Sequence, residues 1–284
     1  MSLGDVFQRG SGGWGAKAGN LRGHGAASAF VPKYAADSPV PYDSHTLAHF
    51  RFNETGPVDL TGVIKFMNEV TGNYDLFTDT GTPHIGGIGP FGERAGTGYA
   101  GSIKLLGNTE NVRLIITASG MEPVNYLTLS VWVFLHTYQR GDGRIITKPY
   151  APVSWPYPYQ VVAFGFDPLK FFYGGVNTAA LLSDTHSATI DSYGIPLREW
   201  VLLSLTYDGA YERIYLNGVE EASFANTGPI TWSTGSYASP WVLGIPRGLS
   251  GEGLDLRYGP LWIEDIARPA SYLRRLYQLG AKRF

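Results

Sequence analysis

The sequence predicts an all-β sandwich, and three observations support this prediction. Short runs rich in β-branched and aromatic residues recur along the chain, each bounded by Gly, Pro, Asn or Asp, as strands joined by turns are. A content of 44% hydrophobic and 14% aromatic residues can build a substantial core in a chain of 284 residues. Convincing helical spacing occurs only near the C-terminus. The clearest strand candidates are Thr46–Phe52, Asn111–Thr117, Leu127–His136, Arg144–Lys148, Gln160–Phe166, Trp200–Tyr207, Glu212–Leu216 and Leu254–Ile263.

The apolar run that contains Trp132 is expected to be an inner strand. Leu129, Val131 and Val133 point to one face of this strand, because side chains alternate along a strand. Trp132 and Phe134 point to the opposite face. Since both faces are apolar, we expect the outer face of the sheet to be covered here.

Turn and helix signals complete the prediction. Asn217-Gly218 can supply the positive φ angles of a tight hairpin, and Gly141–Gly143 predicts a second hairpin. A helix is expected to begin near Pro269 and to end at Gly280. Its apolar positions are Tyr272, Leu273, Leu276, Tyr277 and Leu279.

The charge balance excludes some partners. The 22 basic and 24 acidic residues give a formal net charge of -2, so no overall attraction to nucleic acid or to an anionic membrane is expected.

The chain has no cysteine, which excludes disulfides, thiolate metal sites and cysteine nucleophiles. Residues 1–25 lack the apolar run of roughly 7 to 15 residues of a signal peptide, so we do not expect secretion through such a signal.

Residues 1–43 are rich in Gly, Ala, Ser and Pro and have neither a strand nor a helical period, so we predict an extended arm. Its isolated aromatic residues are Phe7, Trp14, Phe30 and Tyr34. On composition alone this segment is either a disordered tail or an arm that these four rings anchor to a partner.

Several segments occur in the order of one known domain. These are His45–Glu54 with Asp59–Gly62, then Leu127–Val133, then Trp200–Gly209 with Ile214–Gly218, and finally Gly253–Asp265 with the helix up to Gly280. In this order they resemble the strands and closing helix of laminin-G-like, or concanavalin-A-like, lectin domains. The resemblance implies a concanavalin-A-like jelly-roll β-sandwich over residues 44–284, in which residues 63–105 form an insertion.

This resemblance implies a fold used for glycan binding, for protein docking and, in some relatives, for glycoside hydrolysis, so the fold does not settle the function. Hydrolysis requires two carboxylates that flank the scissile bond, and the Glu-x-Asp-x-x-Glu pattern of the hydrolytic relatives is absent. Glu252 with Asp255, and Glu264 with Asp265, have the wrong spacing. The second pair is interpreted as turn or capping carboxylates. The sequence therefore predicts no enzyme and no catalytic residue.

Calcium is common in lectin relatives and prefers several oxygen ligands. The candidates are Asp59, Asp208, Asn217 and Asp255, of which Asp208 and Asn217 are each followed by Gly and are explained as turn residues. Calcium stays open, no ligand is assigned, and no other cofactor is expected.

Two aromatic-rich segments are candidate glycan sites, because aromatic rings stack on the faces of sugars. Trp155, Tyr157 and Tyr159 alternate with prolines that stiffen their segment. Trp232 and Tyr237 lie in a second segment rich in Ser, Thr and Gly, whose aromatic set also includes Trp241. The alternative is that these rings fill the core or seal a subunit interface.

The resemblance and the arm together favour a non-enzymatic structural or accessory protein of a bacteriophage virion, such as a capsid decoration, fibre or tail component. Its expected partners are other virion proteins or copies of itself, bound through the arm, together with a cell-surface glycan. Two alternatives remain open: a glycan-binding module of bacterial polysaccharide metabolism, and a divergent glycoside hydrolase.

Overall fold

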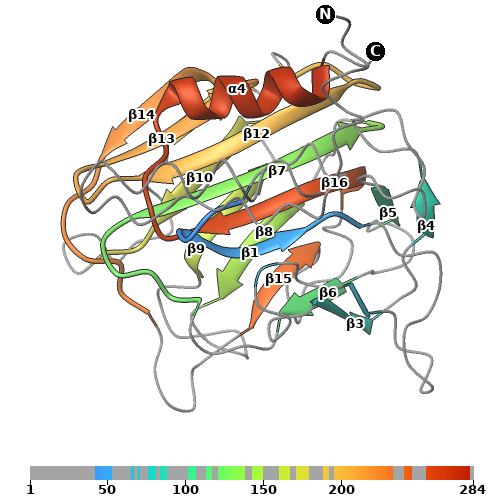
Figure 1. Cartoon of the computed structure of the whole chain (residues 1–284), viewed down its shortest axis with the longest axis horizontal. Coiled ribbons are helices and arrows are strands. Elements are labelled where there is room, and N and C mark those ends of the chain that lie inside the picture. The colour runs from blue at the N-terminus through green and yellow to red at the C-terminus, as the bar shows by residue number, and fades with distance from the viewer. Residues whose placement is uncertain are drawn as a thin grey trace, which may run out of the picture.

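A computed structural model shows a β-sandwich with one helix against it (Figure 1). It describes residues 42–52, 65–66, 70, 76–80, 84–87, 102–106, 113–116, 121–137, 143–149, 160–166, 171–178, 188–191, 195–232, 240–244 and 254–281. Two antiparallel sheets pack face to face, which confirms the predicted all-β jelly-roll sandwich with a short C-terminal helix. Within the described residues, no helix is long and apolar enough to cross a membrane.

The first sheet has the strand order β14-β13-β12-β7-β16-β5-β4, and β1 also pairs with β16. Its strands are β1 (Thr46–Phe50), β4 (His84–Gly87), β5 (Ser102–Leu106), β7 (Leu127–Leu135), β12 (Trp200–Tyr207), β13 (Tyr211–Leu216), β14 (Val219–Ala225) and β16 (Asp255–Glu264).

The second sheet has the order β11-β10-β9-β8-β15-β6-β3-β2. Its strands are β2 (Lys65–Phe66), β3 (Leu76–Thr80), β6 (Arg113–Ile116), β8 (Gly143–Pro149), β9 (Gln160–Phe166), β10 (Phe171–Val176), β11 (Ala188–Asp191) and β15 (Trp241–Gly244). Residues 63–105 thus contribute strands to both sheets, through β2, β3, β4 and β5.

The inner position and the two apolar faces predicted for β7 are confirmed. The strand lies between β12 and β16, and Leu129, Val131 and Val133 belong to the core between the sheets. Trp132 faces outward into a second apolar cluster that includes Leu202, Trp262 and Leu276. Since Leu276 belongs to the helix, the helix covers this outer face.

The tight turn at Asn217-Gly218 is also confirmed, because both residues have positive φ angles, of 54° and 77°. The second predicted hairpin is wrong. β7 and β8, which flank Gly141–Gly143, belong to different sheets, so this connection crosses from one sheet to the other. Turn-forming residues show where the chain can reverse, but the partner of each strand depends on packing.

The helix α4 (Ala270–Ala281) lies over the outer face of the first sheet (Figure 1). The helix begins directly after Pro269, as predicted, and ends at Ala281, one residue beyond the predicted end, so that Gly280 lies within its last turn. A Cβ atom at this position would overlap the ring of Trp132. Glycine is therefore needed for the close approach of α4 to the sheet, and not as a cap.

Candidate functional site

One end of the sandwich, which we call the loop end, gathers the connections of both sheets. Its described parts are residues 121–126, 208–210 and 226–232, and it lies to the left and lower left in Figure 1. The amide of Ile230 donates to the carbonyl oxygen of Val124 at 2.7 Å, and the amide of Asn226 donates to that of Ala210 at 2.9 Å. These bonds join the three segments into one surface.

Two tryptophans hold the segment 121–126 in place. The indole N–H of Trp232 donates to the carbonyl oxygen of Pro123 at 2.8 Å, and that of Trp241 donates to the carbonyl oxygen of Met121 at 3.2 Å. The centroids of the two rings are 5.9 Å apart. A buried indole N–H normally finds such a partner, so both rings serve as supports for this segment.

Lys148 lies beneath the same segment and is only 2% exposed. Its ammonium group is 3.0 Å from the carboxylate of Glu122 and 5.9 Å from the centroid of the Trp241 ring. Burial lowers the pKa of Lys148, although the hydrogen bond and the charge of Glu122 act in the opposite direction. The charge of this lysine is thus neutralised locally.

A buried carboxylate joins the two sheets at the loop end. Glu212 of β13 accepts hydrogen bonds from the amide of Val176 at 2.9 Å and from the side-chain amide of Asn226 at 2.6 Å. The side-chain oxygen of Asn226 accepts in turn from the hydroxyl of Thr178 at 2.7 Å. Because Val176 ends β10 of the second sheet and Thr178 follows it, this network fixes the first sheet against the second.

Tyr207 adds a further brace, since its hydroxyl donates to the carbonyl oxygen of Gly228. Burial raises the pKa of Tyr207 to about 12, and the carboxylates of Glu212 and Asp208 add to this effect. The phenol therefore stays protonated, and remains a donor, at any physiological pH.

The outer surface of the loop end carries exposed apolar side chains. Val124, Tyr126 and Tyr211 are 56%, 49% and 45% exposed. They stand on the braced segments described above, next to the first residues of β7 and β13. Exposed rings on a fixed backbone can provide a stacking surface for a ligand.

Tyr211 is held in place by its neighbours. The guanidinium carbon of Arg213 lies 5.0 Å from the centroid of its ring, and Arg213 itself pairs with Asp208 at 2.6 Å. Asp208 also accepts from the amides of Ala210 and Tyr211, at 3.0 and 2.8 Å, as its predicted turn role requires. Burial acts to raise the pKa of Asp208, but these donors outweigh it, so that the pKa is lowered.

Of the five predicted glycan residues, only Trp232 lies within the described residues; it is half-buried and supports Pro123. Trp155, Tyr157, Tyr159 and Tyr237 lie outside them, as do the arm residues Phe7, Trp14, Phe30 and Tyr34. The strands that flank these segments begin or end at the loop end, where Pro149 pairs with Gln160 and Thr147 pairs with Val242. The assignment of these residues to a glycan site stays a prediction.

Tyr126 and Tyr211 were missed in the sequence. Tyr126 follows Asn125 and directly precedes β7, and Tyr211 is the first residue of β13, two positions after the turn-forming pair Asp208-Gly209. This position indicates an aromatic ring at a strand end. It does not indicate whether the ring is exposed, which depends on segments distant in sequence.

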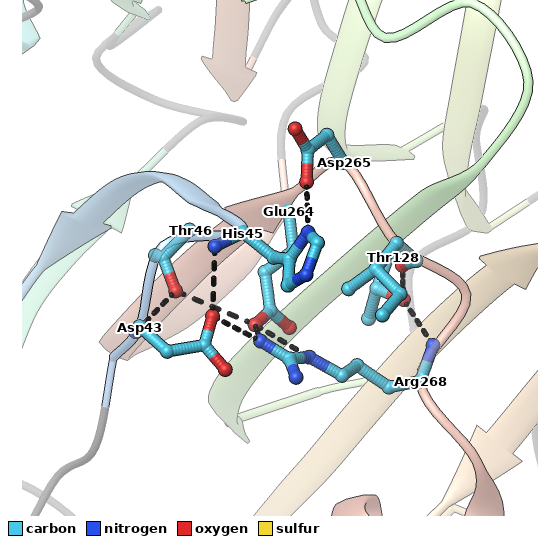
Figure 2. Close-up of polar contacts among 8 residues, drawn as sticks. Asp43, His45, Thr46, Thr128, Glu264, Asp265 and Arg268 are labelled. Carbon is cyan, nitrogen blue, oxygen red and sulfur yellow. Dashed lines mark hydrogen bonds and ion pairs between the residues drawn. The ribbon is translucent and has the colours of Figure 1, made fainter. Parts of the chain in front are cut away.

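A second polar cluster fixes the start of β1 to the end of β16 (Figure 2). Arg268 binds one carboxylate oxygen of Glu264 through two nitrogens, at 2.6 and 2.9 Å, and Asp43 at 2.7 Å. Burial raises the pKa of Glu264 to about 7, against the lowering effect of Arg268. Burial also acts to raise the pKa of Asp43, but the hydrogen bond from Arg268 outweighs it and the pKa is lowered.

The interpretation of Glu264 and Asp265 as turn or capping carboxylates is wrong for Glu264. This residue is fully buried at the end of β16, because the side chain of Arg268 folds back over it. Asp265 is partly exposed and lies 2.9 Å from the imidazole of His45 (Figure 2). The amide of Arg268 bonds to the hydroxyl of Thr128 at 2.9 Å.

The two fully buried glutamates of the described residues have structural partners. Glu212 and Glu264 are fully buried, and each is held by its own hydrogen-bond donors. Among the residues that the structure describes, no group of three His, Asp or Glu side chains could hold a metal ion. The arrangement of the loop end is that of a rigid surface with exposed rings, which suits binding.

No protein-family model matches the sequence, and no curated protein matches it. Solved structures with a similar fold include the botulinum neurotoxin serotype D binding domain, at 11% identity and a TM-score of 0.55, with 82% of this chain and 50% of that chain covered. The serotype D ligand binding domain in complex with N-acetylneuraminic acid has 12% identity and a TM-score of 0.56, with the same shares covered.

Another similar structure is the Trypanosoma rangeli sialidase in complex with 2,3-difluorosialic acid, a covalent intermediate. It has 14% identity and a TM-score of 0.55, with 93% of this chain and 37% of the sialidase covered. The chain thus spans half or less of the length of these proteins. At this identity the likeness shows a shared jelly-roll β-sandwich fold.

Proposed function

We propose that this chain is a non-enzymatic lectin-like module that binds glycans at the loop end of its sandwich. The observation that carries the proposal is the exposure of two aromatic rings, Tyr126 and Tyr211, at this end. Tyr126 and Tyr211 are exposed on braced turns, and the segments that contain Trp155 and Tyr237 are anchored to the neighbouring strands β8, β9 and β15. Aromatic rings with a few polar groups beside them form typical sugar-binding surfaces.

The bracing at this end supports the proposal. A ligand surface gains affinity when its side chains are already ordered, because less conformational entropy is lost on binding. The network of Glu212 and Asn226 joins the sheets directly below the surface, and the indoles of Trp232 and Trp241 fix residues 121–126. The similar fold of a toxin domain solved with N-acetylneuraminic acid is further support.

The proposal includes the absence of catalysis. Glycoside hydrolysis requires two carboxyl groups that can reach the substrate from either side of the bond. Glu212 and Glu264 have no exposed surface and are engaged in structural hydrogen bonds. Turnover of a panel of polysaccharides and sialosides should match that of buffer alone, and release of a reducing sugar above this background would contradict the claim.

The experiment that tests glycan binding is a glycan array with the full chain and two single variants, Trp155→Ala and Tyr157→Ala. We expect the full chain to bind a defined set of glycans and each variant to lose signal on this set. Val219→Ala is the matched control, since Val219 is 47% exposed at the opposite end, beside the β13-β14 turn. If the chain binds no glycan, the proposal is wrong.

Trp232→Ala tests separately whether Trp232 supports the protein backbone or contacts the glycan. Because the indole holds Pro123 and packs against the core, its removal should weaken binding together with thermal stability. If binding were lost while the melting temperature stayed unchanged, Trp232 would be a contact residue instead. The two results assign different roles to the same ring.

We further propose that the module serves as an accessory component of a bacteriophage particle, with residues 1–43 bound to a neighbouring virion protein or to another copy of the chain. The glycine-rich composition of this segment and its four isolated aromatic residues support this statement. Limited proteolysis of the free chain and of the assembled particle tests it. Residues 1–43 should become protected on assembly; cleavage in every assembled state would exclude a docking arm.

The alternative setting is a module of bacterial polysaccharide metabolism. Electron microscopy of the source particle with a labelled antibody separates the two settings. Regular labelling of the particle supports the virion role, and labelling that is confined to cell material supports the alternative.

A further inference from the structure

We propose that the glycan bound by the loop end is uncharged and stacks on Tyr126 and Tyr211, rather than being sialylated or otherwise anionic. This inference rests on the function proposed above and narrows its ligand class. The proposed ligand differs from those in two of the solved structures of similar fold, which contain N-acetylneuraminic acid and difluorosialic acid.

The two tyrosines lie on segments that touch each other. A Cβ atom on Gly209 would lie 3.6 Å from the carbonyl oxygen of Asn125, so the turn before Tyr211 contacts the segment before Tyr126. Both rings are about half exposed, at 49% and 45%. The flat apolar faces of pyranose rings match aromatic faces of this kind, and such stacking requires no charge.

Polar side chains that can form hydrogen bonds with sugar hydroxyls lie on the same segments as the two tyrosines or on the adjoining connection. The side chain of Asn125 is exposed between Val124 and Tyr126, and Thr227 is exposed on the adjoining connection. An amide both donates and accepts hydrogen bonds, and a hydroxyl does the same. These groups match the mixed donor and acceptor character of neutral sugar hydroxyls.

The cations at this end are already neutralised. Lys148 pairs with Glu122, and Arg213 pairs with Asp208 and lies 3.9 Å from Glu220. An anionic ligand could recruit either cation only by breaking an existing ion pair, and it would then leave a carboxylate without its partner.

Arg268, the third described cation of this end, is engaged in the same way. It lies 8% exposed between Glu264 and Asp43. Asp265 adds another carboxylate on the surface, beside His45. The loop end as described therefore repels a negative charge more than it attracts one.

The sequences of four further connections point the same way. Residues 117–120, 150–159, 179–187 and 233–239 adjoin strands that begin or end at the loop end, and they contain no Lys or Arg. A sialic acid carboxylate is usually bound by a cation or by several donors, and these segments supply no cation.

The test is a titration of the full chain with matched pairs of oligosaccharides that differ only in a terminal sialic acid, followed by calorimetry. We expect the neutral member of a pair to bind on the order of tenfold more tightly or better. A roughly tenfold increase in ionic strength should leave this affinity unchanged within about twofold, because no charge pairing contributes.

Variants test whether the binding of neutral glycans depends on the rings of Tyr126 and Tyr211. Tyr126→Ala and Tyr211→Ala should each weaken neutral-glycan binding on the order of fivefold to tenfold. Tyr126→Phe should retain most of the affinity because it keeps the ring, and Val219→Ala is the control at the opposite end. Circular dichroism should be unchanged in all four variants.

The outcomes separate this inference from the function on which it rests. Tighter binding of the sialylated member, or affinity that falls steeply with salt, would overturn the neutral ligand while glycan binding stands; cations of residues 1–41 would then be the next candidates. Unchanged affinity in both alanine variants would overturn the stacking role of Tyr126 and Tyr211. Failure of every oligosaccharide to bind would overturn the proposed function itself.

Discussion

Glu212 on β13 accepts a hydrogen bond of 2.9 Å from the backbone amide of Val176 on β10, so that a buried carboxylate of one sheet satisfies the backbone of the other. A strand that ends in a sandwich leaves backbone donors which need partners. Glu212 provides one of these partners, and Asn226 donates both to Glu212 and to the carbonyl oxygen of Val176. The loop end owes its rigidity to this pair of side chains.

Glu212→Ala should destabilise the fold by about 2 to 4 kcal/mol, because the amides of Val176 and Asn226 would lose a charged acceptor inside the core. Glu212→Gln keeps an acceptor oxygen in the same place, so its loss should be smaller. Urea unfolding measures the loss of unfolding free energy in both variants. A double-mutant cycle with Asn226→Ala should show coupling, and strictly additive effects would contradict the network.

His49 predicts a pH dependence. Its ring is fully buried, with its centroid 5.0 Å from that of Trp262 and 5.6 Å from that of Tyr42. Burial, aided by the charge of Arg51, lowers the pKa of His49 from 6.5 to about 3. The unfolded chain therefore binds a proton more readily than the folded chain. The stability that the folded chain gains from keeping His49 neutral is fully present above pH 6.5 and is lost as the pH falls towards 3.

His49→Phe should remove this dependence while keeping a ring against Trp262. Between pH 7 and pH 5 the free energy of unfolding of the natural protein should fall by about 2 kcal/mol more than that of the variant. Denaturant curves at intervals of half a pH unit measure the difference. Parallel curves would mean that His49 is not the titrating group.

Gly280 illustrates a local rule that packing overrides. Alanine has a higher helix propensity than glycine by up to about 1 kcal/mol, so propensity alone predicts that Gly280→Ala is stabilising. A Cβ atom there would overlap the ring of Trp132, and we expect a loss of about 1 to 3 kcal/mol. Gln278→Ala, at an exposed position of α4, should change the thermal stability little. A more stable Gly280→Ala variant would disprove the contact.

The same contrast explains what the sequence can and cannot predict. Strand positions follow from local alternation, and β9 was predicted over its full range, Gln160–Phe166. Sheet membership is not local, so the connection at Gly141–Gly143 was predicted to be a hairpin although it joins the two sheets. The burial of Glu264 depends on Arg268, four residues later, folding back over the end of its strand.

The candidate site shows the same limit. Aromatic residues near turns identified Trp232, because composition marks such segments. Whether a ring supports the backbone, as Trp232 does, or faces solvent, as Tyr126 and Tyr211 do, depends on which turns meet at one end of the sandwich. The meeting of residues 121–126, 208–210 and 226–232 is a property of the fold and is not encoded in any one segment.

Arg268 provides the last prediction, which concerns the cluster in Figure 2. Its guanidinium is the shared partner of Glu264 and Asp43, with distances of 2.6 and 2.7 Å. Arg268→Leu would leave Glu264 buried without this cation, and we expect a loss of about 3 to 5 kcal/mol near neutral pH. Part of this loss should be recovered at acidic pH, where Glu264 in the variant is protonated and no longer carries a buried charge.

The double variant Arg268→Leu/Glu264→Leu separates burial of a charge from loss of packing. With both charges removed the buried site is apolar, so the double variant should be more stable than Arg268→Leu alone by about 1 to 3 kcal/mol. Urea unfolding at pH 7 and pH 5 measures both variants. A double variant less stable than the single one would show that Glu264 contributes chiefly through its other contact, with the hydroxyl of Thr46.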